Sequence, residues 1–189
     1  GSPSPLAPQV PSLERVVILT DDAHMPETSL PGAVSYESYI AEADGDFEWL
    51  RFEENTAAGM CYTSGTTGDP KGVLYSHRSN ALHAMMALQP DMMNIGSADR
   101  FMPVVPLFHA NGWATAFAVP MAGATMVMPG AGMDGKSVYE MLTSERVTIT
   151  AAVPTVWLML LQYMEENDCK LPALHHVIIG GAACPEAVI

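Results

Sequence analysis

Residues 62–72 read Tyr-Thr-Ser-Gly-Thr-Thr-Gly-Asp-Pro-Lys-Gly, a polar loop that follows directly on a strand-forming run. Its three glycines let the backbone turn tightly and present successive N–H groups to an anion. Its four serine and threonine hydroxyl groups can donate hydrogen bonds to phosphate oxygens, and Lys71 adds a mobile positive charge. A plain surface turn does not need these three features together. We therefore interpret the stretch as an anion-binding loop.

The loop differs from three other signatures of similar composition. Pro70 stands where a Walker A loop has the glycine that precedes its lysine. No G-x-S-x-G pattern surrounds Ser64, so the signature of a serine hydrolase is missing. No G-x-G-x-x-G follows a strand, which argues against a dinucleotide fold.

Strand-like and helix-like segments alternate on both sides of this loop. Short apolar runs predict strands at 16–19, 57–63, 101–105, 125–128, 147–151 and 176–179. Helical spacing predicts helices over about 35–43, from Ser76 onward, over 110–121, from Asp134 onward, and over 154–166. The alternation predicts an α/β fold, with a mostly parallel sheet flanked by helices on both faces. A loop that follows a strand of such a sheet lies where ligands bind.

Apolar residues at helical spacing predict which face of each helix is buried. The same argument makes the 14 methionines core filler rather than part of a cofactor site. The predicted inward residues are Leu82, Met85 and Met86 in one helix, Val138, Met141 and Leu142 in a second, and Val156, Trp157, Leu160 and Met164 in a third.

Composition and charge exclude several classes of protein. The chain has 189 residues, 49% hydrophobic and 15% charged, which favours a globular domain over disorder. The formal net charge is −13, and eleven acidic residues lie between Glu14 and Glu54. No basic cluster could neutralise a run of phosphates, so we expect no nucleic-acid partner. The middle of the chain is near neutral and suits an anionic ligand better.

The sequence offers no metal site, disulfide framework or membrane span. Its three cysteines form no C-x-x-C pair, which indicates reduced thiols. His175 and His176 are adjacent and face opposite sides of a strand, and the acidic residues 42–48 suit a solvated loop. No apolar run reaches the length of about 18 residues that a span requires. We expect a cytoplasmic protein.

Two segments are expected along the chain. Residues 1–12 are a proline-rich lead-in, and Gly1-Ser2 resembles the remnant of a protease cleavage site. Residues 13–189 would form the α/β nucleotide-binding part. We therefore expect an excised piece of a longer protein.

Three motifs carry a resemblance to one family. Residues 62–72 closely resemble the phosphate-binding signature of the adenylate-forming superfamily, which includes acyl-CoA synthetases, luciferases and peptide-synthetase adenylation domains. Residues 106–113, Pro-Leu-Phe-His-Ala-Asn-Gly-Trp, resemble a second signature in the form common among fatty-acyl-CoA synthetases. Residues 180–185 resemble the glycine-rich turn that meets adenine, and 151–155 also fit. The resemblance covers everything after Ser12 and is nearest to the medium-chain fatty-acyl and 3-methylmercaptopropionate branch.

The resemblance implies a two-step reaction with ATP, a carboxylic acid and CoA. The carboxylate attacks the α-phosphate of Mg·ATP to give acyl-AMP and pyrophosphate, and the CoA thiol then displaces AMP. The implied ATP-binding residues are Thr63, Ser64, Gly65, Thr66, Thr67, Gly68 and Lys71 for the phosphates, and Gly180, Gly181 and Ala182 for the adenine. His109 would lie near the acyl carboxylate and the α-phosphate as the catalytic residue, and Trp113 near the acyl pocket.

The resemblance also implies parts that this chain lacks. The family's magnesium-binding glutamate, its ribose-binding aspartate and its C-terminal domain with a catalytic lysine would all follow Ile189. We therefore expect no metal ligand and no acyl-CoA formation by these 189 residues alone. Apolar surface left uncovered predicts self-association.

Three other functions stay open from the sequence. The chain could come from another adenylate-forming enzyme, such as an aryl-CoA ligase or a peptide-synthetase adenylation domain, although residues 106–113 favour the fatty-acyl form. It could be a nucleotide-binding module without catalysis, or a purely structural piece.

Overall fold

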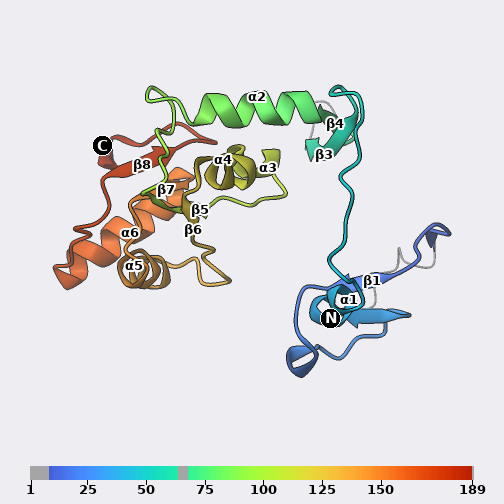
Figure 1. Ribbon diagram of the computed structural model, residues 1–189. Helices are drawn as coiled ribbons and strands as arrows, with labels where there is room; N and C mark the ends of the chain where they lie inside the picture. Colours follow the sequence, from blue (N-terminus) through green and yellow to red (C-terminus); the bar gives the residue numbers. More distant parts are fainter. Residues whose placement is uncertain (1–8, 64–67, 189) are drawn as a thin grey trace. The chain divides into compact units, whose positions relative to one another are not determined.

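The computed structural model describes residues 9–63 and 68–188, except for the side chain of Ala187 (Figure 1). They form two compact units that divide between Arg51 and Phe52. The sequence placed residues 13–189 in one unit. The division falls in a stretch, residues 42–54, in which every side chain is exposed and none joins a core.

The first unit is small and held by polar contacts. Strand β1 (Val16–Ile18) pairs in parallel with β2 (Ala33–Ser35), and helix α1 (Tyr36–Ala41) follows after the Ser35 cap, as predicted. A 3₁₀ turn, η2 (Asp22–His24), lies between the strands. The Asp22 carboxylate accepts hydrogen bonds from the hydroxyls of Ser35 and Ser38 at 2.5 and 2.6 Å, which lowers the pKa of Asp22.

The second unit is built on a four-stranded parallel sheet with the order β6-β5-β7-β8. The strands are β5 (Arg100–Val104), β6 (Thr125–Met126), β7 (Ile149–Ala152) and β8 (His176–Ile179). Met102 pairs with Thr150, and Thr150 pairs with Val177. The four strands lie where the sequence predicts them, although β6 is shorter than expected.

Helices cover both faces of this sheet, which confirms the predicted fold class. Successive residues of β5 point to opposite faces, so Phe101 belongs to one buried cluster and Met102 to the other. On the Met102 face lie α5 (Gly135–Ser144) and α6 (Pro154–Asn167); on the Phe101 face lie α2 (His77–Ala87) and α4 (Thr115–Ala122).

The predicted starts of α2, α5 and α6 are confirmed, whereas the helix predicted over 110–121 is interrupted, because residues 110–114 have positive φ and α4 begins only at Thr115. Ser76 caps α2 in a capping box with Ser79, Asp134 caps α5, and Pro154 occupies the first turn of α6. A short 3₁₀ turn, η3 (Glu186–Val188), follows β8.

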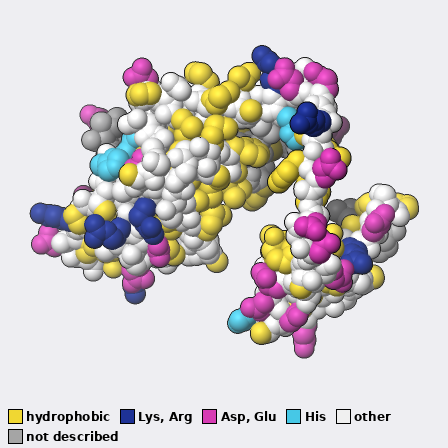
Figure 2. Space-filling model, viewed as in Figure 1, with side chains coloured by type: hydrophobic (Ala, Val, Ile, Leu, Met, Phe, Trp, Pro, Cys, Tyr) yellow, Lys and Arg dark blue, Asp and Glu magenta, His cyan; other side chains and the backbone are white. Residues whose placement is uncertain are grey.

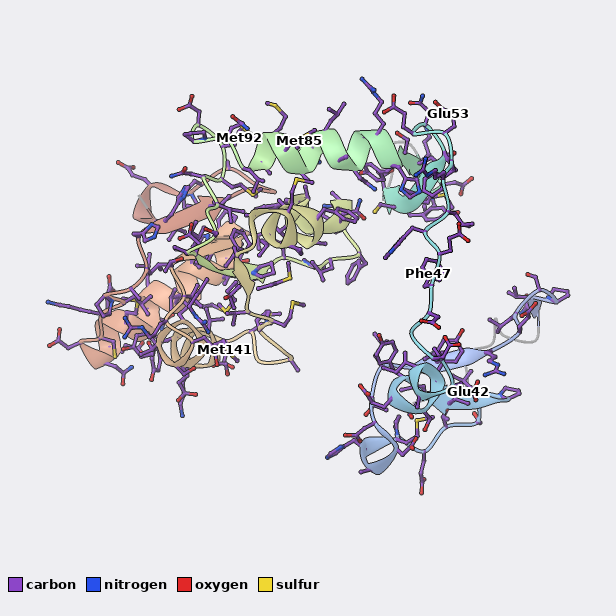
Figure 3. The ribbon with its side chains drawn as sticks, viewed as in Figure 1. Glu42, Phe47, Glu53, Met85, Met92 and Met141 are labelled. Carbon is purple, nitrogen blue, oxygen red and sulfur yellow. The ribbon has the colours of Figure 1, made fainter. Side chains whose placement is uncertain are left out.

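The predicted inward face of α2 is wrong. Ala84 and Ala87 are buried, whereas Met85 (labelled on α2 in Figure 3) and Met86 are 46% and 56% exposed. Leu82, Met85 and Met86 form one row at helical spacing, and Ala84 and Ala87 form another, so either row could face the core. The alanines are buried because their small side chains let α2 pack closer to the neighbouring helix. The expectation that the methionines fill the core is also wrong, because only Met93 and Met102 of the fourteen are buried.

Many large apolar side chains of the second unit are exposed, and methionines are prominent among them. Figure 2 shows hydrophobic side chains gathered on its surface. The exposed methionines are Met60, Met85, Met86, Met92, Met121, Met128, Met133 and Met159.

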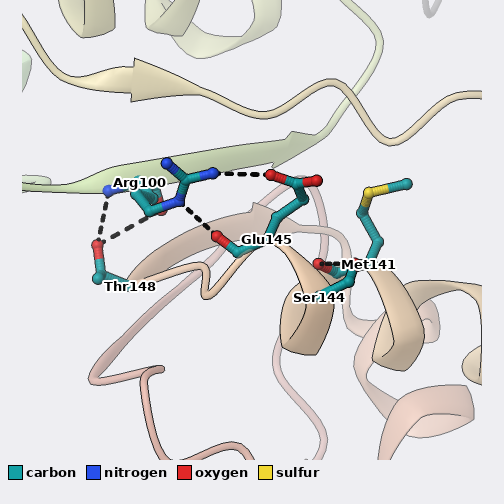
Figure 4. Close-up of polar contacts among 5 residues, drawn as sticks. All are labelled: Arg100, Met141, Ser144, Glu145 and Thr148. Carbon is teal, nitrogen blue, oxygen red and sulfur yellow. Dashed lines mark hydrogen bonds and ion pairs between the residues drawn. The ribbon is translucent and has the colours of Figure 1, made fainter.

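A charged contact closes the amino end of the sheet (Figure 4). Arg100 donates through Nε to the Glu145 carbonyl and through Nη2 to its carboxylate, the latter at 2.7 Å. The Thr148 hydroxyl accepts the Arg100 backbone N–H at 2.9 Å. These contacts tie the start of β5 to the end of α5, at the edge opposite the candidate site.

The described residues contain no helix long and apolar enough to cross a membrane. Within the same residues, no three His, Cys, Asp or Glu side chains come together as a metal site, and all three cysteines are free.

Candidate functional site

The loop predicted to bind an anion joins two strands, only one of which the sequence predicts. Strand β3 (Ala57–Thr63) is confirmed, but a second strand, β4 (Lys71–Ser76), pairs with it antiparallel as a separate two-stranded sheet. The expectation that the loop leaves a strand of the parallel sheet is therefore wrong. The run Val73-Leu74-Tyr75 has the β-branched and aromatic residues of a strand. The sequence analysis did not predict this strand, because the run lies directly between the loop and the helix that Ser76 caps.

Thr63 and Lys71 flank the loop, because they form the last residue pair of the β3–β4 ladder before the chain enters it. The Thr63 hydroxyl donates to the Lys71 carbonyl at 3.4 Å. Lys71 is exposed, and its ammonium group forms no ion pair with any residue in the described ranges. Gly68 has φ +131°, which only glycine adopts easily. The ammonium group is thus available to an anion.

Part of the predicted loop is outside the described residues. Its members there are Ser64, Gly65, Thr66 and Thr67.

The second motif contains a left-handed turn. Helix α3 (Ala110–Trp113) and the following Ala114 have φ values from +47° to +67° at five consecutive positions. Each non-glycine residue in this conformation costs about 1–2 kcal/mol. At Gly112 a side chain would come within 2.7 Å of Leu107 Cδ2. Backbone strain of this kind is typical of functional sites.

The turn presents His109 to solvent. The His109 backbone N–H donates to the Pro106 carbonyl at 3.0 Å, and its own carbonyl accepts the Gly112 N–H at 3.0 Å. The residue is exposed, and it lies in the connection that follows the carboxyl end of β5. That edge of a parallel sheet is where ligands bind.

The same turn brings Trp113 against the third motif. A β-carbon on Gly180 would lie 2.8 Å from Trp113 Cη2 and 3.2 Å from Cζ2 and Cζ3. Gly181 has φ +78°, and a β-carbon there would lie 3.1 Å from Val153 Cγ1. The structure therefore joins Trp113 to both glycines, although the sequence assigns them to different parts of the ligand. Ala182 is exposed beyond them.

Asn111 connects the turn to two other elements, a role that the sequence analysis missed. The Cys61 thiol in β3 donates to Asn111 Oδ1 at 3.8 Å, and Asn111 Nδ2 donates to Asn80 Oδ1 in α2 at 3.3 Å. Asn111 lies inside the second motif, but the sequence does not show which residues its side-chain amide hydrogen-bonds.

An apolar cavity of about 520 Å³ opens at the same edge of the sheet. Residues 103–108, 128–130 and 133 line it, together with Val156 and Met159 of α6. The described lining does not include Trp113. Such a cavity suits an alkyl group better than a phosphate.

The structure thus combines an α/β fold with a glycine- and hydroxyl-rich loop, a strained turn with an exposed histidine, and a glycine pair against a tryptophan. The chain belongs to the family of AMP-binding enzymes, which matches residues 4–189. This confirms the resemblance.

Two of the similar curated proteins are CoA ligases. The chain is 42% identical over 180 residues to a medium-chain-fatty-acid–CoA ligase from Ectopseudomonas oleovorans, covering 95% of this chain and 33% of the relative. It is 45% identical over 160 residues to a 3-methylmercaptopropionyl-CoA ligase from Ruegeria lacuscaerulensis, covering 85% and 30%. The chain thus spans about a third of the length of these relatives.

The fold is also shared with a solved structure. The N-terminal domain of FACL13 from Mycobacterium tuberculosis matches with a TM-score of 0.73 and 28% identity, covering 85% of this chain and 40% of that one.

Proposed function

We propose that this chain forms the ATP phosphate-binding part of an acyl-CoA synthetase, in which a carboxylic acid is activated as an acyl-adenylate and transferred to CoA. The observation that carries the proposal is the exposed Lys71 ammonium group, without an ion-pair partner in the described ranges, at the mouth of a loop rich in glycine and hydroxyl groups. The names of the two curated relatives support a medium-chain fatty acid or 3-methylmercaptopropionate as the acid.

The proposed chemistry needs charge neutralisation more than covalent help from the protein. A carboxylate oxygen attacks the α-phosphorus and pyrophosphate leaves, so negative charge grows on the leaving group. Lys71 and the loop hydroxyls stabilise that charge where it develops. His109, exposed at the carboxyl edge of the sheet, lies beside the carboxylate. In the second step the CoA sulfur forms the thioester bond and AMP leaves.

Two further ligand contacts complete the proposal. The backbone of Gly180, Gly181 and Ala182 forms the wall for the adenine, with Trp113 behind the glycine pair. The apolar cavity beside the His109 motif offers an environment for the alkyl part of the acid.

Among residues 9–63 and 68–188, no three His, Cys, Asp or Glu side chains come together as a metal site. Magnesium in ATP-dependent enzymes is held largely by the substrate phosphates, and the roles proposed above are those of this chain's own side chains.

Calorimetric titration of the 189-residue chain with ATP, AMP and pyrophosphate tests the proposal. We expect ATP and pyrophosphate to bind, and Lys71→Ala to weaken both by about tenfold or more, since a charge-assisted hydrogen bond contributes about 1.5–3 kcal/mol. The affinity for AMP, which lacks the β- and γ-phosphates, should fall less in Lys71→Ala. Lys170→Ala is the matched control, because Lys170 is also an exposed lysine.

Two results would refute the proposal. One is an unchanged ATP affinity in Lys71→Ala. The other is no nucleotide binding at all, which would favour a purely structural role.

Self-association belongs to the same proposal. Apolar side chains on the outer faces of the hairpin and of α2, among them Leu74 and Met86, are well exposed and favour contact with another apolar surface. Sedimentation velocity over a wide concentration range tests this, and a strictly monomeric profile at high concentration counts against it.

A further inference from the structure

The three motifs lie on different elements, and only one described side chain makes hydrogen bonds that join the His109 turn both to β3, which leads into the first motif, and to α2. Asn111 accepts from Cys61 in β3 and donates to Asn80 in α2, and it sits in the left-handed turn itself. Cys61 lies two residues before Thr63, the end of the ladder that frames the loop. On the other side, Asn111 lies two residues after His109 and two before Trp113.

The conformation of Asn111 does not by itself require the side chain. Asparagine tolerates a positive φ better than most residues, but glycine tolerates it better still. Asn111 has φ +52°. The choice of asparagine over glycine therefore has to come from its amide group, whose acceptor and donor each find a partner on a different element.

From these contacts we propose that Asn111 is a positioning residue that couples the phosphate-loop hairpin to the His109 turn. This inference rests on the proposed function. The amide holds β3, and with it Thr63 and Lys71, in a fixed relation to the turn that presents His109. A triphosphate at the loop and a carboxylate at the histidine then meet in the geometry that in-line attack needs.

The matching perturbation is Asn111→Gly, which removes the amide and keeps a residue suited to a positive φ. Asn94→Gly is the matched control, because Asn94 also has a positive φ, +50°, and is exposed. Asn94 also makes no side-chain hydrogen bond to any described residue, whereas its backbone N–H donates to Gln89. Far-UV circular dichroism and thermal unfolding check that both variants keep the fold.

Thiol labelling reports the contact directly. In the parent chain the Cys61 thiol is partly buried and donates to Asn111, so we expect Asn111→Gly to increase its rate of maleimide labelling about three- to tenfold, measured by peptide mass spectrometry. Labelling of Cys169 and Cys184 serves as an internal reference and should not change. Asn94→Gly should label as the parent does.

Pyrophosphate then tests the coupling. If β3 and the turn are linked, saturating pyrophosphate slows Cys61 labelling in the parent chain, and this protection is reduced in Asn111→Gly. Calorimetry should show pyrophosphate binding about three- to tenfold weaker in Asn111→Gly than in the parent or in Asn94→Gly.

The outcomes separate this inference from the proposed function. Loss of pyrophosphate binding in Lys71→Ala, together with unchanged labelling and affinity in Asn111→Gly, overturns the coupling and leaves the phosphate loop intact. Equal pyrophosphate binding by the parent and Lys71→Ala overturns the proposed function. A merely structural role for Asn111 would lower the unfolding temperature and leave the protection by pyrophosphate unchanged, which also overturns the coupling.

Discussion

Replacing Gly180 with alanine tests the contact between the glycine turn and Trp113. The added β-carbon would lie 2.8 Å from Trp113 Cη2 and 3.2 Å from two further ring atoms. The ring is a rigid plane attached to a strained turn, so it cannot move aside as the end of a flexible chain does. Overpacking of this kind costs about 1–3 kcal/mol of the free energy of unfolding.

Urea unfolding followed by circular dichroism measures this loss. Gly59→Ala is the control, because a β-carbon at Gly59 meets nothing within 4 Å and φ there is not positive. We expect the control to change stability by about 0.5 kcal/mol or less.

A double substitution then assigns the cost to the ring. Trp113→Phe removes the distal ring atoms that the new β-carbon would approach, so Gly180→Ala should cost much less in that background, with a coupling of about 1 kcal/mol or more. The reasoning is refuted if Gly180→Ala costs the same in both backgrounds, or no more than Gly59→Ala.

Three other predictions concern the second unit. Gly135→Ala should destabilise more than Gly180→Ala in urea unfolding, because its β-carbon would run into the backbone carbonyl of Met159, which cannot move without separating α5 from α6. Ser76→Ala should lower the free energy of unfolding by about 1 kcal/mol, because the capping box of α2 is lost, and an unchanged urea midpoint would contradict this. Hydrogen bonds from the Ser137 hydroxyl and N–H lower the pKa of Asp134 from its usual 3.8. The ionised carboxylate therefore stabilises the fold fully above that pH, and this contribution is lost as the pH falls through the lowered pKa. The stability difference between the parent and Asp134→Ala should therefore be constant from pH 8 to about pH 5 and shrink in stronger acid; a difference that persists in acid would show that the carboxylate charge is not involved.

Local signals in the sequence predicted most elements of the second unit. Caps at Ser76 and Asp134, the proline that opens α6, and the apolar run of β8 each depend on neighbours within a few residues. Such short-range chemistry is visible in the sequence. The motif of residues 62–72 could also be recognised from the sequence, because glycines, hydroxyl residues and a lysine rarely occur together at this spacing.

The errors have two physical origins. In α2 the stripe of Leu82, Met85 and Met86 and the stripe of Ala84 and Ala87 have the same period, and only the neighbouring layer selects between them. Strand β4 was overlooked because its partner lies across the loop.

The sequence by itself determined the fold class, the starts of α2, α5 and α6, and the family, since each depends on residue type and spacing along the chain. Tertiary structure alone decided that the loop belongs to a separate hairpin, that Trp113 lies on the Gly180 turn, and that Asn111 bonds to both Cys61 and Asn80. The contacts of Trp113 and Asn111 join residues 31 to 67 positions apart, and a hydrogen bond or a packed ring depends on which surfaces the folded chain brings within a few ångströms.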